Sequence, residues 1–375
     1  MKFVVAPDSF KETLTAKEAA AIMESCIRRR YPDADIAVIP VADGGEGTAE
    51  CIAAACGGTM IYADVTFSDR KVNKAGFAML PDGTAVVDIA AASGIWYARG
   101  KVLPDAATTY GTGELIGAAI RAGAGRIIIG LGGSATHDLA CGCAAALGVR
   151  FYNSAGETFV PVGATLKDVA DIDVSGISLP HGADVTVLCD VDITPFGEGG
   201  AACVYAPQKG ADADMCMMLD EGTRHLCEVI SSSLGIDVSS LRGGGAAGAS
   251  GAGLYAFLGA KLRRGIDAVL DITGFDAAAK NAEAVFTGEG RTDRQTPSGK
   301  AIYGVAKRAK AVGSGTIVIS GSYDEDEKLW DALSKAGVKR IYSVTDGKRD
   351  IASLRLTAAD DLRRRTDEIL NELRF

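Results

Sequence analysis

The sequence predicts an α/β protein of two domains, one of them built on a doubly wound parallel sheet. Short apolar runs alternate with amphipathic helical patterns at the beginning of the chain and again at its end, which is typical of parallel β-α-β units. The middle of the chain has a different texture, with a hairpin pattern and glycine-rich loops. A chain of 375 residues is also long enough for two domains with a core each.

Two β-α repeats open the chain. Thr15 and Glu18 have the S/T-x-x-E spacing of a capping box, so we expect the first helix to begin near Ala16. A glycine pair at 57–58 ends the second helix. The expected elements are a strand at 3–6, a helix from 16, a strand at 36–41 and a helix through 55.

The same alternation closes the chain, with a final helix whose apolar face carries Leu362, Ile369 and Leu370. The expected elements are strands at 284–287, 316–320 and 340–344, and helices at 300–311, 327–336 and from about 357. Two strands from the beginning and three from the end make a five-stranded doubly wound sheet if the two ends fold together.

The middle of the chain predicts a second α/β domain inserted into the first. A hairpin is expected over 76–89, around the turn at 81–83. Further strands are expected at 126–130 and 185–190, and helices up to 121, up to 147, over 215–234 and after the glycine-rich stretch 243–253. We therefore expect one discontinuous domain at 1–66 and 285–375, and an inserted domain at 67–284.

The composition is that of an ordinary soluble protein, with 47% hydrophobic and 23% charged residues. A net charge of -9 and a pI near 5.0 argue against a nucleic-acid or acidic-membrane partner, although a local basic pocket could still bind a small anion. The N-terminus lacks the shape of a signal peptide and no apolar run reaches membrane-spanning length, so we expect a cytoplasmic protein. The sequence leaves the oligomeric state open.

Nine cysteines include no CxxC pair, and an odd number cannot all pair within one chain. We expect reduced, mostly buried cysteines. A zinc site is a weaker alternative, because only three histidines are present and none has ligand spacing from these cysteines.

A charged loop follows the expected strand at 284–287. Its carboxylates could hold a divalent cation and its cations could neutralise phosphate oxygens, which phosphoryl transfer needs beside one another. The charged residues are Glu289, Arg291, Asp293, Arg294 and Lys300. The alternative is a solvated loop whose charges pair with one another; glycines such as Gly288 at the end of a buried strand favour the functional interpretation.

A second candidate loop follows the expected strand at 126–130. It supplies two glycines, two hydroxyls and a carboxylate, in Gly132, Gly133, Ser134, Thr136 and Asp138. Free N–H groups at a helix start form an anion site, so this loop predicts contact with a phosphate or a nucleotide. The alternative is a simple helix cap, which needs only one hydroxyl.

Two more loops lie where a doubly wound sheet places its ligands, at the carboxyl ends of its first two strands. Asp8, Ser9 and Lys11 follow the first strand; Lys11 is either a clamp for phosphate or carboxylate or a plain surface lysine. Asp43 and Glu46 follow the second strand and could bind substrate hydroxyls or magnesium, or could only form the turn.

Asp190 and Asp192, at the end of a strand in the middle of the chain, are either metal ligands or helix caps. No Ser-His-Asp arrangement is offered by the three histidines, which are His137, His181 and His225. The loop at 7–13 has no glycine and no Walker-type lysine follows a glycine loop, which argues against a P-loop protein and an ordinary dinucleotide enzyme.

Motifs spread nearly end to end make the chain similar to the bacterial type I glycerate kinase family. They lie at 6–11, 40–48, 110–114, 132–136, 207–210, 260–263 and 287–291. The resemblance implies ATP-dependent phosphorylation of D-glycerate with magnesium, and 2-phosphoglycerate rather than 3-phosphoglycerate as the product. It also implies a flavodoxin-like domain that is split by an inserted α/β domain.

Three stretches depart from the usual pattern of that family. His137-Asp138-Leu139-Ala140 stands where the family usually has Asn-Asp-Gly-Gly. The run from Ile193 to Phe196 replaces Asn-Pro-Leu, and Ala249-Ser250 replaces a glycine pair. All three lie in the expected inserted domain, so the resemblance supports kinase chemistry more firmly than it supports the substrate.

On this resemblance we hypothesise the following roles. The expected catalytic residues are Lys11, Asp43, Asp138 and Arg291, and the expected substrate-binding residues are Asp8, Ser9, Glu46, Arg294 and Lys300. The expected nucleotide or phosphate contacts are Gly132, Gly133, Ser134, Thr136, Gly288 and Glu289, and the expected magnesium ligands are Asp190 and Asp293. The alternatives are a kinase of another small hydroxy or sugar acid, a catalytically silent ligand-binding homologue, and a less favoured nicotinamide-dependent oxidoreductase.

Overall fold

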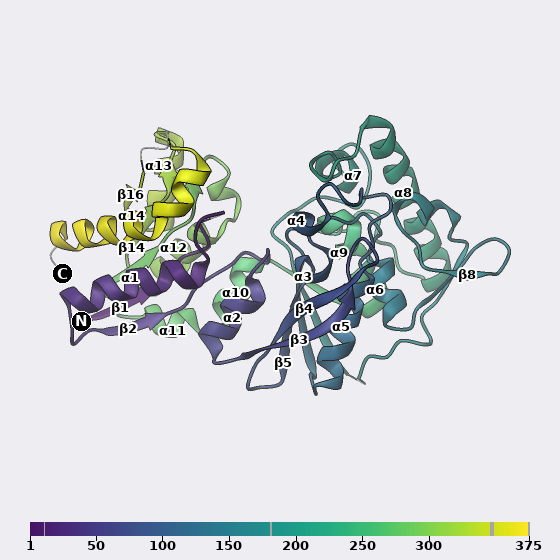
Figure 1. Cartoon of the computed structure of the whole chain (residues 1–375), viewed down its shortest axis with the longest axis horizontal. Coiled ribbons are helices and arrows are strands. Elements are labelled where there is room, and N and C mark those ends of the chain that lie inside the picture. The colour runs from purple at the N-terminus through teal and green to yellow at the C-terminus, as the bar shows by residue number, and fades with distance from the viewer. Residues whose placement is uncertain (11, 181, 346–348, 374–375) are drawn as a thin grey trace. The chain divides into compact units, whose positions relative to one another are not determined.

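The computed structural model describes residues 1–10, 12–180, 182–345 and 349–373 (Figure 1). It confirms the α/β class. The chain divides into two compact units: unit 1 contains Met1–Asp43, Ala54–Gly57 and Ile266–Phe375, and unit 2 contains Gly44–Ala53 and Gly58–Gly265. Within the described residues, no helix is both long enough and apolar enough to span a membrane.

Unit 1 is built on a parallel sheet whose strands come from both ends of the chain. The described strands are β1 (Lys2–Val5), β2 (Asp35–Val38), β12 (Ala284–Thr287), β14 (Thr316–Ser320) and β16 (Val338–Ser343). Their order is β16-β14-β12-β1-β2, with β1 between β12 and β2. Counted along the chain within the unit this order is 2-1-3-4-5, one of the two common orders of doubly wound sheets.

Helices cover both faces of this sheet. The helices are α1 (Ala16–Arg30), α10 (Gly265–Ile272), α11 (Phe275–Ala279), α12 (Ala301–Ala311), α13 (Glu327–Ala336) and α14 (Ile351–Glu372). Ile317 and Ile319 pack in one apolar cluster with α1 and α14, which lie side by side in Figure 1. Val318 between them packs in a second cluster with α12 and α13, as the alternation of side chains along a strand requires.

Local hydrogen bonds cap the N-termini of two of these helices, α1 and α14. The capping box of α1 is confirmed, since Glu18 N–H donates to Thr15 Oγ1 at 3.2 Å and Thr15 N–H donates to Glu18 Oε2 at 2.8 Å. The last helix begins at Ile351 rather than near Thr357, because Asp350 caps it by accepting from an N–H at 2.9 Å. Its first turns are largely exposed and therefore show no apolar periodicity.

Unit 2 contains a mixed sheet. Its strands are β3 (Thr59–Thr66), β4 (Val72–Met79), β5 (Thr84–Asp88), β6 (Arg126–Gly130), β10 (Asp184–Leu188) and β11 (Lys261–Arg263), in the order β11-β10-β6-β5-β4-β3. β3, β4 and β5 pair antiparallel, while β5, β6, β10 and β11 pair parallel. The carboxyl ends of those four parallel strands therefore meet at one edge of the sheet.

Helices and short elements complete unit 2. The α-helices are α2 (Thr48–Cys56, whose last turn belongs to unit 1), α3 (Ala90–Ser93), α4 (Ile95–Ala98), α5 (Tyr110–Arg121), α6 (Cys141–Ala146), α7 (Ala201–Tyr205), α8 (Ala213–Leu234) and α9 (Ala246–Leu258). A small sheet joins β7 (Arg150–Tyr152), β8 (Thr158–Phe159) and β9 (Asp171–Asp173). The 3-10 helices of the chain are η1 (Gly163–Asp168), η2 (Pro207–Lys209) and η3 (Thr296–Ser298), and β13 (Arg291–Thr292) pairs with β15 (Ser322–Tyr323) in unit 1.

The unit boundaries differ from the expected edges at 66/67 and 284/285. Residues 59–66 belong to unit 2, because β3 pairs with β4 along its whole length, from Thr59 opposite Met79 to Thr66 opposite Val72. Residues 266–284 belong to unit 1, where the hydroxyl of Ser314 donates to the carbonyl of Ala279 at 2.6 Å. No strand was expected over 59–66, and the contact of Ala279 with Ser314 joins residues 35 apart in the chain, so local patterns did not place the edges.

All nine cysteines lie among the described residues, and all are free. Five of them are buried, in keeping with the expectation of reduced, structural cysteines, and the buried set is Cys26, Cys51, Cys141, Cys143 and Cys227. Burial raises the pKa of Cys26 to about 11, so its thiol stays protonated at neutral pH.

Candidate active site

Two glycine loops of unit 2 meet at the carboxyl end of its sheet. The N–H of Gly132, which follows β6, donates to the carbonyl of Gly44 at 2.9 Å. A Cβ on Gly132 would lie 2.4 Å from the Cα of Gly45, so only glycine permits this approach. The predicted phosphate loop and the loop that carries Glu46 are therefore neighbours. Glu46 is exposed, whereas Asp43 belongs to unit 1.

Asp88 fixes the second of these loops to the end of β5. Its carboxylate accepts the N–H groups of Gly47 at 3.0 Å and Ala49 at 3.2 Å. The side chain is buried, and this burial raises the pKa of Asp88 to about 7, although the two N–H donors act to lower it. Asp88 thus binds free N–H groups at the start of α2. Because these groups directly follow Glu46, Asp88 fixes the position of the loop that contains Glu46.

Lys209 organises the loop that contains the two predicted hydroxyls. Its ammonium donates to Ser134 Oγ at 3.0 Å and to the carbonyl of Thr136 at 2.8 Å. Ser134 and Thr136 are both buried. Neither hydroxyl caps a helix, since α6 begins only at Cys141 and its N-cap residue makes no side-chain capping bond. The capping alternative is therefore wrong for these two residues.

Asp138 is the buried carboxylate of the same loop. Its Oδ2 accepts from the N–H and the hydroxyl of Thr109, both at 2.8 Å, and from the N–H of Gly142 at 3.3 Å. Burial raises the pKa of Asp138 to about 6, although these donors act to lower it. The group therefore titrates near neutral pH, in the range suited to a general base.

Three consecutive side chains of this loop have a buried polar atom with no hydrogen-bond partner in the described part of the chain: Thr136 Oγ1, His137 Nδ1 and Asp138 Oδ1. Such atoms are rare in folded proteins, because a buried polar atom without a hydrogen bond destabilises the fold by about 1 to 3 kcal/mol. His137 is held by Thr223 through its Nε2 at 3.0 Å, and burial lowers the pKa of His137 to about 3, so the ring is neutral. The clustering of these atoms makes this loop the strongest candidate for a ligand site.

The departures from the family pattern keep the backbone that glycine would adopt. Leu139 and Ala140, at the expected glycine pair, have φ of 52° and 55°, and Ala249 at the other altered pair has φ of 64°. Leu139 N–H donates to the carbonyl of Gly248 at 3.2 Å, which joins the two stretches. These side chains thus occupy a left-handed backbone that glycine adopts freely, at a cost of about 1 to 2 kcal/mol for each left-handed residue.

The predicted site residues of unit 1 gather at the carboxyl ends of β1, β12 and β14. Asp8 N–H donates to the carbonyl of Gly288 at 2.8 Å, and Ser9 N–H donates to the Asp8 carboxylate at 2.6 Å. The structure thus brings together the loop after β1 and the loop after β12. Lys11 lies outside the described residues.

Glu289 is the buried residue at the centre of the charged loop. Its Oε1 accepts from the hydroxyls of Thr292 and Thr296, both at 3.0 Å. Burial raises the pKa of Glu289, although Lys300 and the two hydroxyls act to lower it. Glu289 therefore holds the shape of the loop from inside, and its role toward a nucleotide stays a prediction.

The three cations of this loop form ion pairs. Arg291 lies 3.0 Å from Asp324, Arg294 donates to Asp326 at 2.6 Å, and Lys300 donates to Asp293 at 3.0 Å; this pairing is what the surface-loop alternative expects. The side chains of Arg291 and Arg294 are 67% and 79% exposed, so these pairs contribute little to stability. An anionic ligand can therefore displace either carboxylate at small cost.

Asp190 and Asp293 are candidate magnesium ligands in different units. Asp190 Oδ1 accepts the N–H of Gly265 at 2.8 Å. Burial acts to raise the pKa of Asp293, but Lys300 and the N–H of Gln295 keep that pKa below its usual value, so the group is ionised. The described residues contain no cluster of three or more His, Cys, Asp or Glu side chains that could hold a metal. A lone carboxylate still suits Mg²⁺ that is held mainly by substrate phosphates and water.

Comparison with known proteins decides the family. The model of the glycerate kinase family matches residues 3–374. The chain belongs to the glycerate kinase family. It is 42% identical to a glycerate kinase of Bacillus subtilis (strain 168), with 100% of this chain and 98% of the relative covered. It is also 42% identical to a glycerate 2-kinase of Escherichia coli (strain K12), with 92% and 90% covered.

The fold agrees with that of a solved relative. The crystal structure of a Salmonella typhimurium LT2 protein, provisionally named glycerate kinase 2, superposes with a TM-score of 0.88. It is 38% identical and the match covers 99% of this chain and 98% of that chain. This member of the glycerate kinase family is therefore a phosphotransferase, and it matches these relatives over nearly their full length.

For this member of the glycerate kinase family, sequence reasoning missed two residues of the candidate site. Lys209 lies in the 207–210 motif, which carried the resemblance but was given no role. Asp88 directly follows the apolar run 85–87, and a carboxylate at the end of a buried strand was the signal that could have found it.

Proposed function

We propose that this protein transfers the γ-phosphoryl group of ATP to D-glycerate, with 2-phosphoglycerate favoured over 3-phosphoglycerate as the product. The observation that carries the proposal is the buried loop Ser134–Asp138. Lys209 donates to this loop, and three polar atoms of the loop have no hydrogen-bond partner among the described residues. The membership of the glycerate kinase family supports the reaction class. The charged loop of unit 1 supports it further, since phosphoryl transfer depends on placed charges.

The roles follow from the chemistry of each side chain. Asp138, or Asp43, orients the attacking hydroxyl, and a pKa of about 6 suits Asp138 to accept its proton at neutral pH. Lys11 and Arg291 hold the substrate carboxylate or the transferred phosphoryl group. The remaining substrate contacts are Asp8, Ser9, Glu46, Arg294 and Lys300, and those of the nucleotide phosphates are Gly132, Gly133, Ser134, Thr136, Gly288 and Glu289.

Magnesium belongs to the proposal as the partner of ATP. When bound, it neutralises charge on the triphosphate. Asp190 and Asp293 would hold it, each as a single carboxylate. We also propose that the protein is cytoplasmic.

The test is ADP release from ATP and magnesium, with and without D-glycerate. Release that depends on D-glycerate, with a product identified by ³¹P NMR, supports the proposal and settles the phosphorylated position. Binding of ATP without any release would favour a catalytically silent ligand-binding homologue. Lys11→Ala and Arg291→Ala each test one assignment, and turnover unchanged in both variants would show that these two roles are wrong.

Asp138 gives the proposal a pH dependence. A base with a pKa of about 6 is protonated, and therefore inactive, at lower pH, so kcat/KM rises as the pH increases from 5 to 7. Asp138→Asn removes the base and reduces kcat about 100-fold or more while D-glycerate still binds. A variant that keeps the wild-type pH profile would assign the proton transfer to another group, with Asp43 the next to test.

A second candidate is a kinase of another small hydroxy or sugar acid. It is favoured by the departures at His137, Leu139, Ala140 and Ile193, the first three of which lie in the loop that carries Asp138. A panel of acids compared by kcat/KM separates the two candidates. A higher value for any other acid than for D-glycerate would replace the substrate and keep the reaction.

A further inference from the structure

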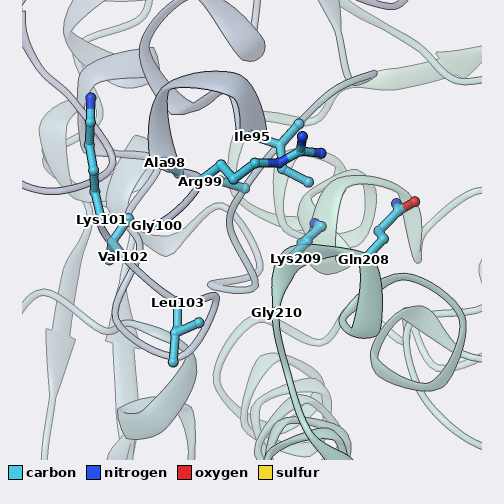
Figure 2. A pocket seen from close by; sticks show the side chains of 11 residues that line it. Ile95, Ala98, Arg99, Gly100, Lys101, Val102, Leu103, Gln208, Lys209 and Gly210 are labelled. Atoms are coloured by element: carbon cyan, nitrogen blue, oxygen red, sulfur yellow. The ribbon is translucent and has the colours of Figure 1, made fainter. Parts of the chain in front are cut away.

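A pocket of about 390 Å³ in unit 2 adjoins the Ser134–Asp138 loop and shares Lys209 with the candidate site (Figure 2). It lies between the segment 95–103 and the turn η2, and Ala135 of the Ser134 loop forms part of its wall. Backbone hydrogen bonds fix the segment to the loop: Ile95 N–H donates to the carbonyl of Gly133, and Ala135 N–H donates to that of Ser93, both at 2.8 Å. Its volume is within the range of small-molecule sites.

The ionisable side chains that line this pocket are all cationic. They are Arg99, Lys101 and Lys209, and no acidic residue is among the described residues of the lining. In a chain with a net charge of -9, a pocket whose ionisable side chains are all basic indicates an anionic ligand. Figure 2 shows the guanidinium of Arg99 on the side of Gln208 and Lys209, whereas Lys101 extends away from them.

The position of Lys209 is fixed by the predicted phosphate loop. Its bonds to Ser134 Oγ and the carbonyl of Thr136 engage two of its three N–H donors. Both acceptors are neutral, and burial lowers the pKa of Lys209 to about 7, although Asp138 acts to raise it. The hydroxyl of Thr136, one residue beyond Ala135, is one of the buried atoms without a partner. An oxyanion bound beside Lys209 would favour the charged form of this buried side chain and could accept its remaining N–H.

We propose that this pocket binds the oxyanion group of a small molecule, a carboxylate or a phosphate, with Arg99 and Lys209 as its cationic contacts. The inference rests on the proposed function, in that the substrate acid supplies the carboxylate and the transferred group supplies the phosphate. Arg99 presents a planar fork that suits either group. Ile95, Val102 and Leu103 make the rest of the wall mostly apolar, which suits a short carbon skeleton and leaves few other polar contacts.

The test uses a fluorophore that the chain already provides. Arg99 lies with its guanidinium carbon 4.8 Å from the centre of the Trp96 ring, and Trp96 is 54% exposed. The chain has only one other tryptophan, Trp330 in α13 of unit 1. Trp330→Phe therefore gives a protein whose emission reports on Trp96. We expect saturable emission changes when it is titrated, without nucleotide, with D-glycerate or with inorganic phosphate.

Variants assign the response to the pocket. Arg99→Ala and Lys209→Met should each raise the Kd from calorimetry about tenfold, since a charge-assisted hydrogen bond is lost. Arg126→Ala is the matched control, because it removes an exposed arginine at the amino end of β6, opposite the end that leads to Gly132. Arg99 is itself exposed, so its replacement tests the pocket even if Lys209→Met fails to fold.

Each outcome decides the proposal. Saturation by D-glycerate alone makes this a carboxylate site, saturation by phosphate alone makes it a phosphate site, and competition between the two shows that both groups occupy it. If neither probe changes the emission, or if both variants bind like the wild type, the pocket proposal is wrong. If D-glycerate saturates the emission, wild-type KM for D-glycerate in both variants would reject the pocket and leave the kinase proposal standing. If the wild type binds phosphate but does not phosphorylate D-glycerate, and Arg99→Ala loses that binding, the pocket proposal stands and the kinase proposal is wrong.

Discussion

Left-handed backbone at non-glycine residues surrounds the buried loop of unit 2. Ala247 and Gly248 are adjacent and have φ of 54° and 67°, yet they tolerate a methyl group differently. Ala247 is only partly buried, whereas a Cβ on Gly248 would lie 2.1 Å from the carbonyl oxygen of Thr136. Side-chain size and backbone conformation can therefore be tested separately at neighbouring positions.

We expect Ala247→Gly to stabilise the protein by about 0.5 kcal/mol, because relief of left-handed strain exceeds the added entropy of the unfolded chain. Gly248→Ala should destabilise it by about 2 kcal/mol or more, because the backbone of Thr136 has to move. Urea unfolding measures both changes. Equal effects in the two variants would mean that the loops 136–140 and 247–249 are not in this close contact.

Asp88 gives stability a pH dependence. Its pKa of about 7 in the folded protein is above the ordinary value of 3.8, so between these two pH values the folded state binds more protons than the unfolded state. The free energy of unfolding therefore falls as the pH rises through this window. Compared with Asp88→Asn, the wild type should lose about 2 to 3 kcal/mol between pH 5 and pH 8. Urea unfolding at the two pH values checks this, and a constant difference would place the pKa of Asp88 near its ordinary value.

At the scale of elements, two glycine loops form the candidate site only because their backbones touch. Gly132→Ala should reduce kcat/KM about 100-fold, since a methyl group 2.4 Å from the Cα of Gly45 separates the loops and misplaces Glu46. Gly125→Ala is the matched control, because a Cβ there meets no atom within 4 Å and the residue precedes the same strand. Steady-state kinetics of the two variants tests this; equal activity would remove the loop contact from the site.

Elements with strong local signals were predicted closely. The strands at 126–130, 284–287 and 316–320 have the bounds that their apolar runs indicate, since glycine or a charged residue ends each run. The helix expected up to 147 was different: it begins only at Cys141 and ends at Ala146, because the residues before it adopt left-handed turns at Leu139 and Ala140. Such turns are not expected of leucine or alanine.

The candidate site was predicted in outline, and the buried contacts were not. Glycines and charges at strand ends indicated the loops at 132–138 and 288–300. The positions of Asp88 and Lys209 depend on partners about 40 and 75 residues away, Gly47 and Ser134, and local spacing carries no information about them. The ion partners of Arg291 and Arg294 come from another strand end for the same reason.

At the scale of the whole molecule, each unit has an apolar core of its own. Leu226 is fully buried in the core of unit 2, and Ile27 is fully buried in a core of unit 1. Calorimetry should therefore show two transitions rather than one two-state transition. Leu226→Ala and Ile27→Ala each remove about 2 to 5 kcal/mol, so each should lower the temperature of a different transition. A single transition lowered equally by both variants would show that the units unfold as one.

The order of the strands in unit 1 has a consequence for synthesis on the ribosome. β1 is paired on one side by β12, which begins at Ala284, nearly 250 residues after β2 ends at Val38. At about 5 to 20 residues per second, the β1-β2 pair waits roughly 12 to 50 s for that partner, while the whole of unit 2 emerges and can fold. During that interval β1 is an open edge of hydrophobic residues, the kind of surface that aggregates or recruits chaperones. The nascent chain, more than the finished enzyme, is where this topology is vulnerable.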